Sequence, residues 1–206
     1  MKQILWIAVL IGSLALLGSG CMDRTQLVDQ NNDTEIVAGL DYKDFSEAAE
    51  ATVRQILGSK KVARLTAADK TYVVAVGAVQ DETPLGIDTD LITARITEAL
   101  LNDERFTISS VFAATSSNRD TMVSDARTVR GNAEFNAATV QKQGQLKAPD
   151  FSLTGKIIAR DVKRDNGGHQ YEYYFQLRMS DMASGTVVVS KETRIIKRTG
   201  KKSHTW

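Results

Sequence analysis

The sequence predicts a single compact domain of the α/β (α+β) class, with a mixed sheet and helices packed mainly on one face of it. Two observations carry this prediction. Residues 71–111 have the pattern of a complete β–α–β unit, and residues 151–196 show the two-residue alternation of an antiparallel meander. The chain of 206 residues is long enough for one well-buried core and a short appendage.

The β–α–β unit begins with an apolar, β-branched run from Tyr72 to Val79, as expected for a central strand covered on both faces. Asp88 then stands at the N-cap position of a helix. Apolar residues of this helix share one face, which must pack on the strand: Ile92, Ile96, Ala99 and Leu100. Phe106 to Val111 is predicted as the second strand, and the short crossover favours a right-handed parallel pair. Because the unit has no phosphate-binding glycine pattern, it predicts scaffold and no chemistry.

The segments around this unit predict further helices. An apolar stripe indicates a helix from Asp41 to Leu57, and Lys60 to Lys70 is predicted as a connection. After the second strand, Ser116 to Arg130 is predicted as a surface helix and Ala133 to Gln143 as another helix.

The last third of the chain predicts a meander of three antiparallel strands, separated by turn residues at 165–168 and 184–185. In the middle strand every second residue is apolar, which indicates a core face rather than a ligand platform: Tyr171, Tyr173, Phe175, Leu177 and Met179. Tyr174 falls on the other face among polar residues and is a candidate surface anchor.

The first residues predict export and lipidation. Residues 1–20 have a positive start and a short apolar core, and they resemble a bacterial lipoprotein signal peptide that ends before Cys21. Cys21 would be acylated, with palmitate among the acyl chains, and several chains would anchor the protein stably. The residue after it is Met22, not aspartate, which favours sorting to the outer membrane. The alternative is an ordinary secretory peptide with an incidental cysteine.

Residues 21–38 are polar and are predicted to form a short tether. Residues 39–202 are predicted to form the folded domain, and residues 203–206 a tail. Fully extended, the stretch from Met22 to Leu40 reaches at most roughly 65 Å. As a coil it spans about 25 Å.

Composition excludes several classes of function. The net charge of +1 is nearly balanced, so a general nucleic-acid binder is not expected. One cysteine allows no intrachain disulfide, and one cysteine with two histidines cannot form the usual Cys/His metal sites. His169 lies in a predicted turn and His204 near the last residue, so neither suits nucleophilic catalysis. The paired carboxylates Asp88 and Asp90 are explained by helix capping. No catalytic site, metal or cofactor is predicted.

Two basic groups are candidate partner-binding surfaces for an acidic protein. Three arginines fall roughly on one side of the predicted surface helix: Arg119, Arg127 and Arg130. Four further cations follow one strand and its turn: Lys156, Arg160, Lys163 and Arg164. The alternative for both groups is ordinary solvated charge on exposed elements.

Several motifs resemble the LpoB family of outer-membrane lipoproteins, which activate class A penicillin-binding proteins. Residues 87–92, running on to 105–108, are similar to the family signature "IDT.LIT…L…..KF". Residues 148–157 resemble its "APDY.L.GKI" strand, and residues 39–45, 173–177 and 184–195 resemble further family segments. With the lipid cysteine, the resemblance covers about residues 39–202.

This resemblance implies a single domain similar to the N-terminal domain of TolB, without a catalytic site, on the periplasmic side of the outer membrane. It implies a non-enzymatic regulator of peptidoglycan synthesis, and so of cell shape. Such a regulator would cross the peptidoglycan mesh and bind the periplasmic domain of a bifunctional synthase. Well-studied members carry a long Pro-rich linker, whereas the tether here is short. The alternative is therefore a non-catalytic envelope assembly or secretion lipoprotein that acts at the outer membrane.

Overall fold

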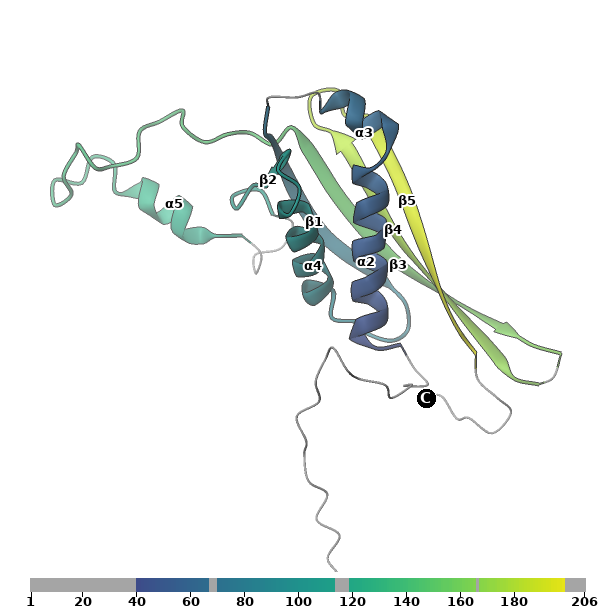
Figure 1. Cartoon of the computed structure of the whole chain (residues 1–206). Helices are drawn as coiled ribbons and strands as arrows, with labels where there is room; N and C mark the ends of the chain where they lie inside the picture. Colours follow the sequence, from purple (N-terminus) through teal and green to yellow (C-terminus); the bar gives the residue numbers. More distant parts are fainter. Residues whose placement is uncertain (1–39, 67–69, 114–118, 166, 199–206) are drawn as a thin grey trace, which may run out of the picture. The chain divides into compact units, whose positions relative to one another are not determined.

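Five strands form one mixed sheet in the order β2-β1-β3-β4-β5. The computed structural model describes residues 40–66, 70–113, 119–165 and 167–198, which belong to one compact unit spanning Val37–Trp206. β1 (Tyr72–Glu82) pairs in parallel with β2 (Phe106–Ile108) and with β3 (Phe151–Lys163). β4 (His169–Asp181) and β5 (Val187–Arg198) complete an antiparallel meander with β3. The mixed sheet predicted from the sequence is confirmed (Figure 1).

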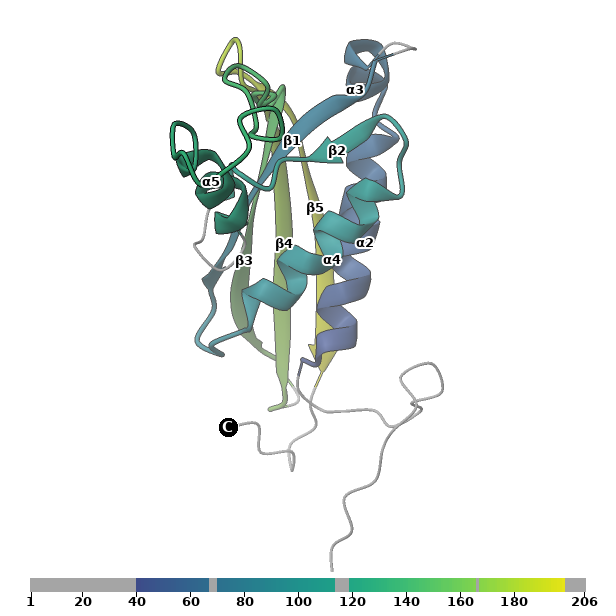
Figure 2. The same ribbon diagram turned by 90° about the vertical axis from the view of Figure 1, so that its left-hand side faces the viewer.

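Two helices cover one face of this sheet. α2 (Tyr42–Leu57) begins with a capping box, in which the Asp44 backbone N–H donates to Asp41 and the Asp41 N–H donates to Asp44. α4 (Thr89–Leu101) is capped by Asp88, as predicted. Figure 2 shows both helices on the same side of the sheet.

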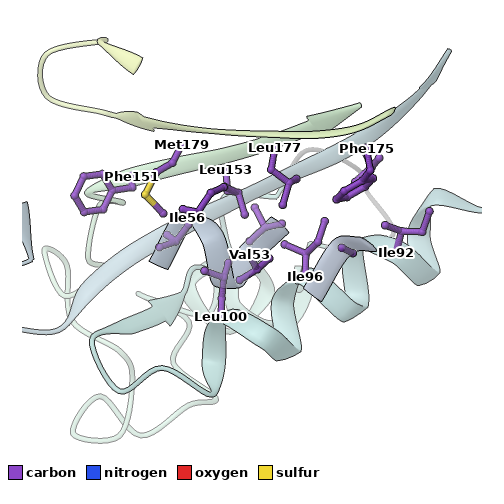
Figure 3. Packing of buried hydrophobic residues seen from close by; sticks show 14 of the residues in the cluster. Val53, Ile56, Ile92, Ile96, Leu100, Phe151, Leu153, Phe175, Leu177 and Met179 are labelled. Atoms are coloured by element: carbon purple, nitrogen blue, oxygen red, sulfur yellow. The ribbon is translucent and has the colours of Figure 1, made fainter. Parts of the chain in front are cut away.

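The core lies between these helices and the sheet (Figure 3). The spacing of apolar residues along each element explains this core, since every core residue falls on the inward face of its helix or strand. The largest buried side chains come from both layers: Val53, Ile56, Ile92, Ile96 and Leu100 from the helices, and Leu153, Ile157, Phe175, Leu177 and Met179 from the strands.

Several predicted boundaries were wrong. The segment predicted as a connection contains a short helix, α3 (Lys60–Leu65), and the second strand ends at Ile108, not Val111. The surface helix α5 is shorter than predicted, Thr121–Thr128, and residues 133–143 form turns where a helix was predicted. Asn132 and Asn136 explain those turns, because their side-chain oxygens accept the backbone N–H groups of Glu134 and Ala138.

We call residues 109–150 the excursion, because they leave the sheet after β2 and return to it at β3. α5 makes no close contact with any other helix or strand among the described residues. Pro149 is the one buried residue of the excursion in the part that the structure describes.

Gly155 allows close packing beside an irregularity of β1. The register of β1 against β3 shifts between Val76 and Val79, and Val79 then lies opposite Gly155. A Cβ atom at Gly155 would meet the Cδ2 atom of Leu177 at 2.7 Å and the Cγ2 atom of Val79 at 3.3 Å. Both neighbours are buried, so neither can move away easily.

We therefore expect Gly155→Ala to lower the free energy of unfolding by about 1–3 kcal/mol, through overpacking. Urea unfolding of both proteins measures this, and the exposed neighbour Thr154→Ala is the control. Equal stability of the glycine and alanine proteins would show that the core opens at this point without cost.

Candidate functional site

The meander buries one face and leaves the other without a helix. Odd-numbered residues of β3 and β4 point toward α2 and α4, and Leu153, Ile157, Phe175 and Leu177 are at most 1% exposed. Even-numbered residues point the other way, where none of the described helices packs (Figure 1). We call this surface the open face. Its charged and aromatic side chains are Lys156, Arg160, Glu172, Tyr174, Arg178, Glu192, Arg194 and Arg198.

Strand register gathers four of these side chains into one group, which we call the Arg–Tyr cluster. Arg160 of β3 lies directly opposite Glu172 of β4, and Arg194 of β5 lies directly opposite Tyr174. Side chains opposite each other on one face of a sheet are close neighbours. Residues from three strands therefore surround the single carboxylate of Glu172.

Glu172 is held in place by hydrogen bonds. It is only 9% exposed, and it accepts hydrogen bonds from the Tyr174 hydroxyl at 2.5 Å and from Gln170 Nε2 at 2.7 Å. Gln170 in turn accepts a hydrogen bond from Arg198 Nε at 2.9 Å. The bond from Tyr174 holds the pKa of Glu172 below its usual value, helped by Gln170 and by the positive charges of Arg194 and Arg160. The carboxylate is thus ionised at neutral pH and fixes the tyrosine ring.

The arrangement suits protein binding. Tyrosine and arginine are over-represented among the residues that dominate binding energy at protein interfaces. Cations outnumber carboxylates on the open face, and Arg178 forms no ion pair within the described ranges. A preformed network also lowers the entropy lost when side chains become ordered on binding. The open face therefore fits an acidic protein surface.

Three of the residues predicted from the sequence lie on this face. Lys156, Arg160 and Tyr174 all point outward, and Lys156 pairs with Glu82 of β1 at 3.5 Å. Lys163 belongs to the opposite set of alternating residues and lies across from His169. Arg164 is in the hairpin turn, where its backbone N–H donates to the carbonyl of Gly168.

The prediction that three arginines share one helix face was wrong. Arg119 precedes α5 and Arg130 follows it, so only Arg127 is helical. Arg130 donates from Nε to the carbonyl of Gln141 at 2.6 Å and from its Nη2 to the carbonyl of Lys142. Its guanidinium group thus closes a loop of the excursion.

Sequence reasoning missed Glu172, Arg178 and Arg194 as members of the site. Their alternation along two predicted strands was visible, but the register that sets Arg194 opposite Tyr174 depends on the turn at 184–185. His169 begins β4 instead of lying in a turn, and its Nδ1 is 3.0 Å from Asp161 while its ring stacks on Tyr171.

The predicted signal peptide, Cys21, the tether and the tail lie outside the described residues. Within the described ranges, no helix is both long and apolar enough to cross a membrane. The same ranges contain no group of three His, Cys, Asp or Glu side chains that could hold a metal ion.

Tyr174→Phe should raise the pKa of Glu172 toward its ordinary value, because the charged form loses a hydrogen bond. A carboxyl group with a lowered folded-state pKa stabilises the fold above its unfolded pKa, and this stabilisation is lost as the pH falls through the folded value. The Tyr174→Phe variant should lose part of this stabilisation. A ¹³C NMR titration of the Glu172 carboxyl measures the shift. The control is Tyr72→Phe, which removes a hydroxyl that bonds the carbonyl of Leu65. An unchanged Glu172 titration in Tyr174→Phe would contradict the hydrogen bond.

Comparison with known proteins identifies the family. The C-terminal domain of LpoB from Escherichia coli is 16% identical, with 74% of this chain and 98% of that domain covered and a TM-score of 0.42. The NMR structure of E. coli LpoB is 14% identical, with 88% of this chain and 85% of that chain covered and a TM-score of 0.43. No curated protein sequence matches the chain. The family model "Peptidoglycan-synthase activator LpoB" matches residues 44–195, and the chain therefore belongs to the LpoB family.

Proposed function

We propose that this protein is an outer-membrane lipoprotein, anchored through Cys21, that binds and activates a bifunctional class A penicillin-binding protein. Membership of a family of peptidoglycan-synthase activators is the observation that carries the proposal. The protein acts by binding and catalyses no reaction itself. Its partner is the periplasmic domain of the synthase, and it faces the periplasm.

The Arg–Tyr cluster supplies the contact with the synthase. Its residues come from three hydrogen-bonded strands, so their spacing is rigid and can match a fixed pattern of carboxylates on a partner. The predicted candidates Lys163, Arg164, Arg119 and Arg127 lie outside this cluster and are secondary. Peptidoglycan strands are a second proposed contact of the basic surface.

Activation follows from linkage. A protein that binds the active conformation of an enzyme more tightly than the resting one shifts the population toward the active form. The same coupling makes the active synthase bind the lipoprotein more tightly. The contact therefore changes the rate without supplying any catalytic group.

The first test is a glycan-polymerisation and cross-linking assay of the cognate class A synthase, with and without residues 39–206. We expect acceleration at stoichiometric amounts. If the protein neither binds nor stimulates a class A synthase from its own cell, the proposal fails.

The matched test of the surface neutralises Arg160 and Arg194 together, as Arg160→Gln with Arg194→Gln. We expect binding to the synthase to weaken roughly tenfold or more, because a partner carboxylate loses its counter-charge. The control is Lys43→Gln with Arg54→Gln, which removes the same charge from exposed positions on α2. Calorimetry at two salt concentrations measures the affinity of each double variant for the synthase. Equal affinities for the two double variants would exclude the Arg–Tyr cluster as the contact with the synthase.

A second candidate function is envelope assembly or secretion at the outer membrane. The short tether favours it, since a coil of about 25 Å keeps the domain near its anchor. Deletion of the gene distinguishes the two. Loss of an exported product with normal synthase activity supports the second function, and reduced peptidoglycan synthesis supports the first.

A further inference from the structure

An apolar groove of about 650 Å³ opens at the end of the sheet where β1 begins. Five separate parts of the fold line it: Leu65 of α3, Tyr72 of β1, Phe151 of β3, Phe112 of the excursion, and Met182 of the β4–β5 turn. The groove is therefore a product of tertiary structure and is not visible in any one segment of sequence.

Large apolar side chains are exposed in this groove. Leu65 is 43% exposed, Phe112 48% and Met182 49%. A single exposed apolar side chain is ordinary, but three that share one concave surface indicate a binding site.

Hydrogen bonds to backbone groups hold the walls of the groove in place. The Asp150 carboxylate accepts the Val73 N–H at 2.8 Å, and the Asp150 N–H donates to the Val73 carbonyl at 2.8 Å. The carbonyl of Asp150 accepts the Met182 N–H at 2.9 Å, and the Tyr72 hydroxyl donates to the carbonyl of Leu65. Because one residue joins β1, β3 and the β4–β5 turn, the groove is preformed and little order has to be gained on binding.

The rim of the groove carries a net negative charge. Lys70 pairs with Asp150 at 2.8 Å, and its Nζ lies 4.6 Å from the centre of the Tyr72 ring. Asp181 adds a second carboxylate, and within the described ranges it has no cation as partner, although its Oδ1 accepts hydrogen bonds from Ser184. A complementary ligand must therefore place a cation beside an apolar group.

The groove lies at the end of the domain opposite Leu40. Residues 1–39 join the domain at the start of α2, whereas Leu65 follows the end of that helix (Figure 1). A helix of 16 residues is about 24 Å long, which separates the two ends. The groove and the start of α2, from which the N-terminal segment departs, are therefore at opposite ends of the domain.

We propose that this groove receives a short apolar segment of the synthase, in which a lysine or arginine is adjacent to the inserted side chain. The inference rests on the proposed function and adds a second contact to it. The open face binds an acidic surface of the partner, and the groove binds an apolar, basic segment of the same partner.

The test uses the acylated chain in detergent with the cognate synthase. Leu65→Asp and Met182→Asp each place a charge in the groove, and Leu91→Asp is the matched control on α4, at a leucine that is 50% exposed and does not line the groove. We expect roughly tenfold weaker binding for the two groove variants and unchanged binding for Leu91→Asp, with equal thermal unfolding midpoints for all.

A photo-crosslinker at position 182, with position 91 as control, then identifies the occupant. The expected product is a synthase peptide with adjacent apolar and basic residues, crosslinked from position 182 alone. Wild-type affinity for the synthase in both groove variants, or equal crosslinking from both positions, overturns the proposal that the groove binds the synthase. Either result leaves the proposed function intact. A wild-type chain that binds no synthase overturns both.

Discussion

Helical cover on one face only is the constraint on which the rest of this structure depends. α2 and α4 together bury the inward residues of the sheet, so every strand of the meander must alternate between apolar and polar side chains. The outward residues are then free of packing demands. That freedom allows Arg160, Tyr174 and Arg194 to gather around Glu172, whose carboxylate accepts a hydrogen bond from the Tyr174 hydroxyl.

The two candidate surfaces differ in chemistry. The Arg–Tyr cluster is basic and built on three strands, whereas the groove is concave, apolar and acidic at its rim. They lie on separate stretches of β4, because Glu172 and Asp181 are about 30 Å apart along an extended strand. A partner that touches both must be the size of a small domain. Opposite charge at the two positions would also fix its orientation.

The sequence was most informative where the pattern is local. The β–α–β unit and the core face of β4 follow from residue spacing, and Asp88 is recognisable as a cap. α3 was missed because a helix of six residues is too short to show a period. The helix predicted at residues 133–143 failed because Asn132 and Asn136 stabilise turns with their own side chains. The Arg–Tyr cluster and the groove depend on register and on contacts between distant segments, which no local pattern encodes.

Both ends of the excursion are fixed to neighbouring residues of one strand. Ser109 donates to the carbonyl of Val74, and Asp150 donates to the carbonyl of Val73, so the forty or so residues between them start and finish almost at the same point. Loop-closure entropy changes by only about 0.6 kcal/mol for each doubling of length. The sheet is thus nearly indifferent to what is inserted there. Within this architecture the segment can diverge, lengthen or be exchanged during evolution while the hydrophobic interior stays the same, much as antibody loops vary on a constant framework.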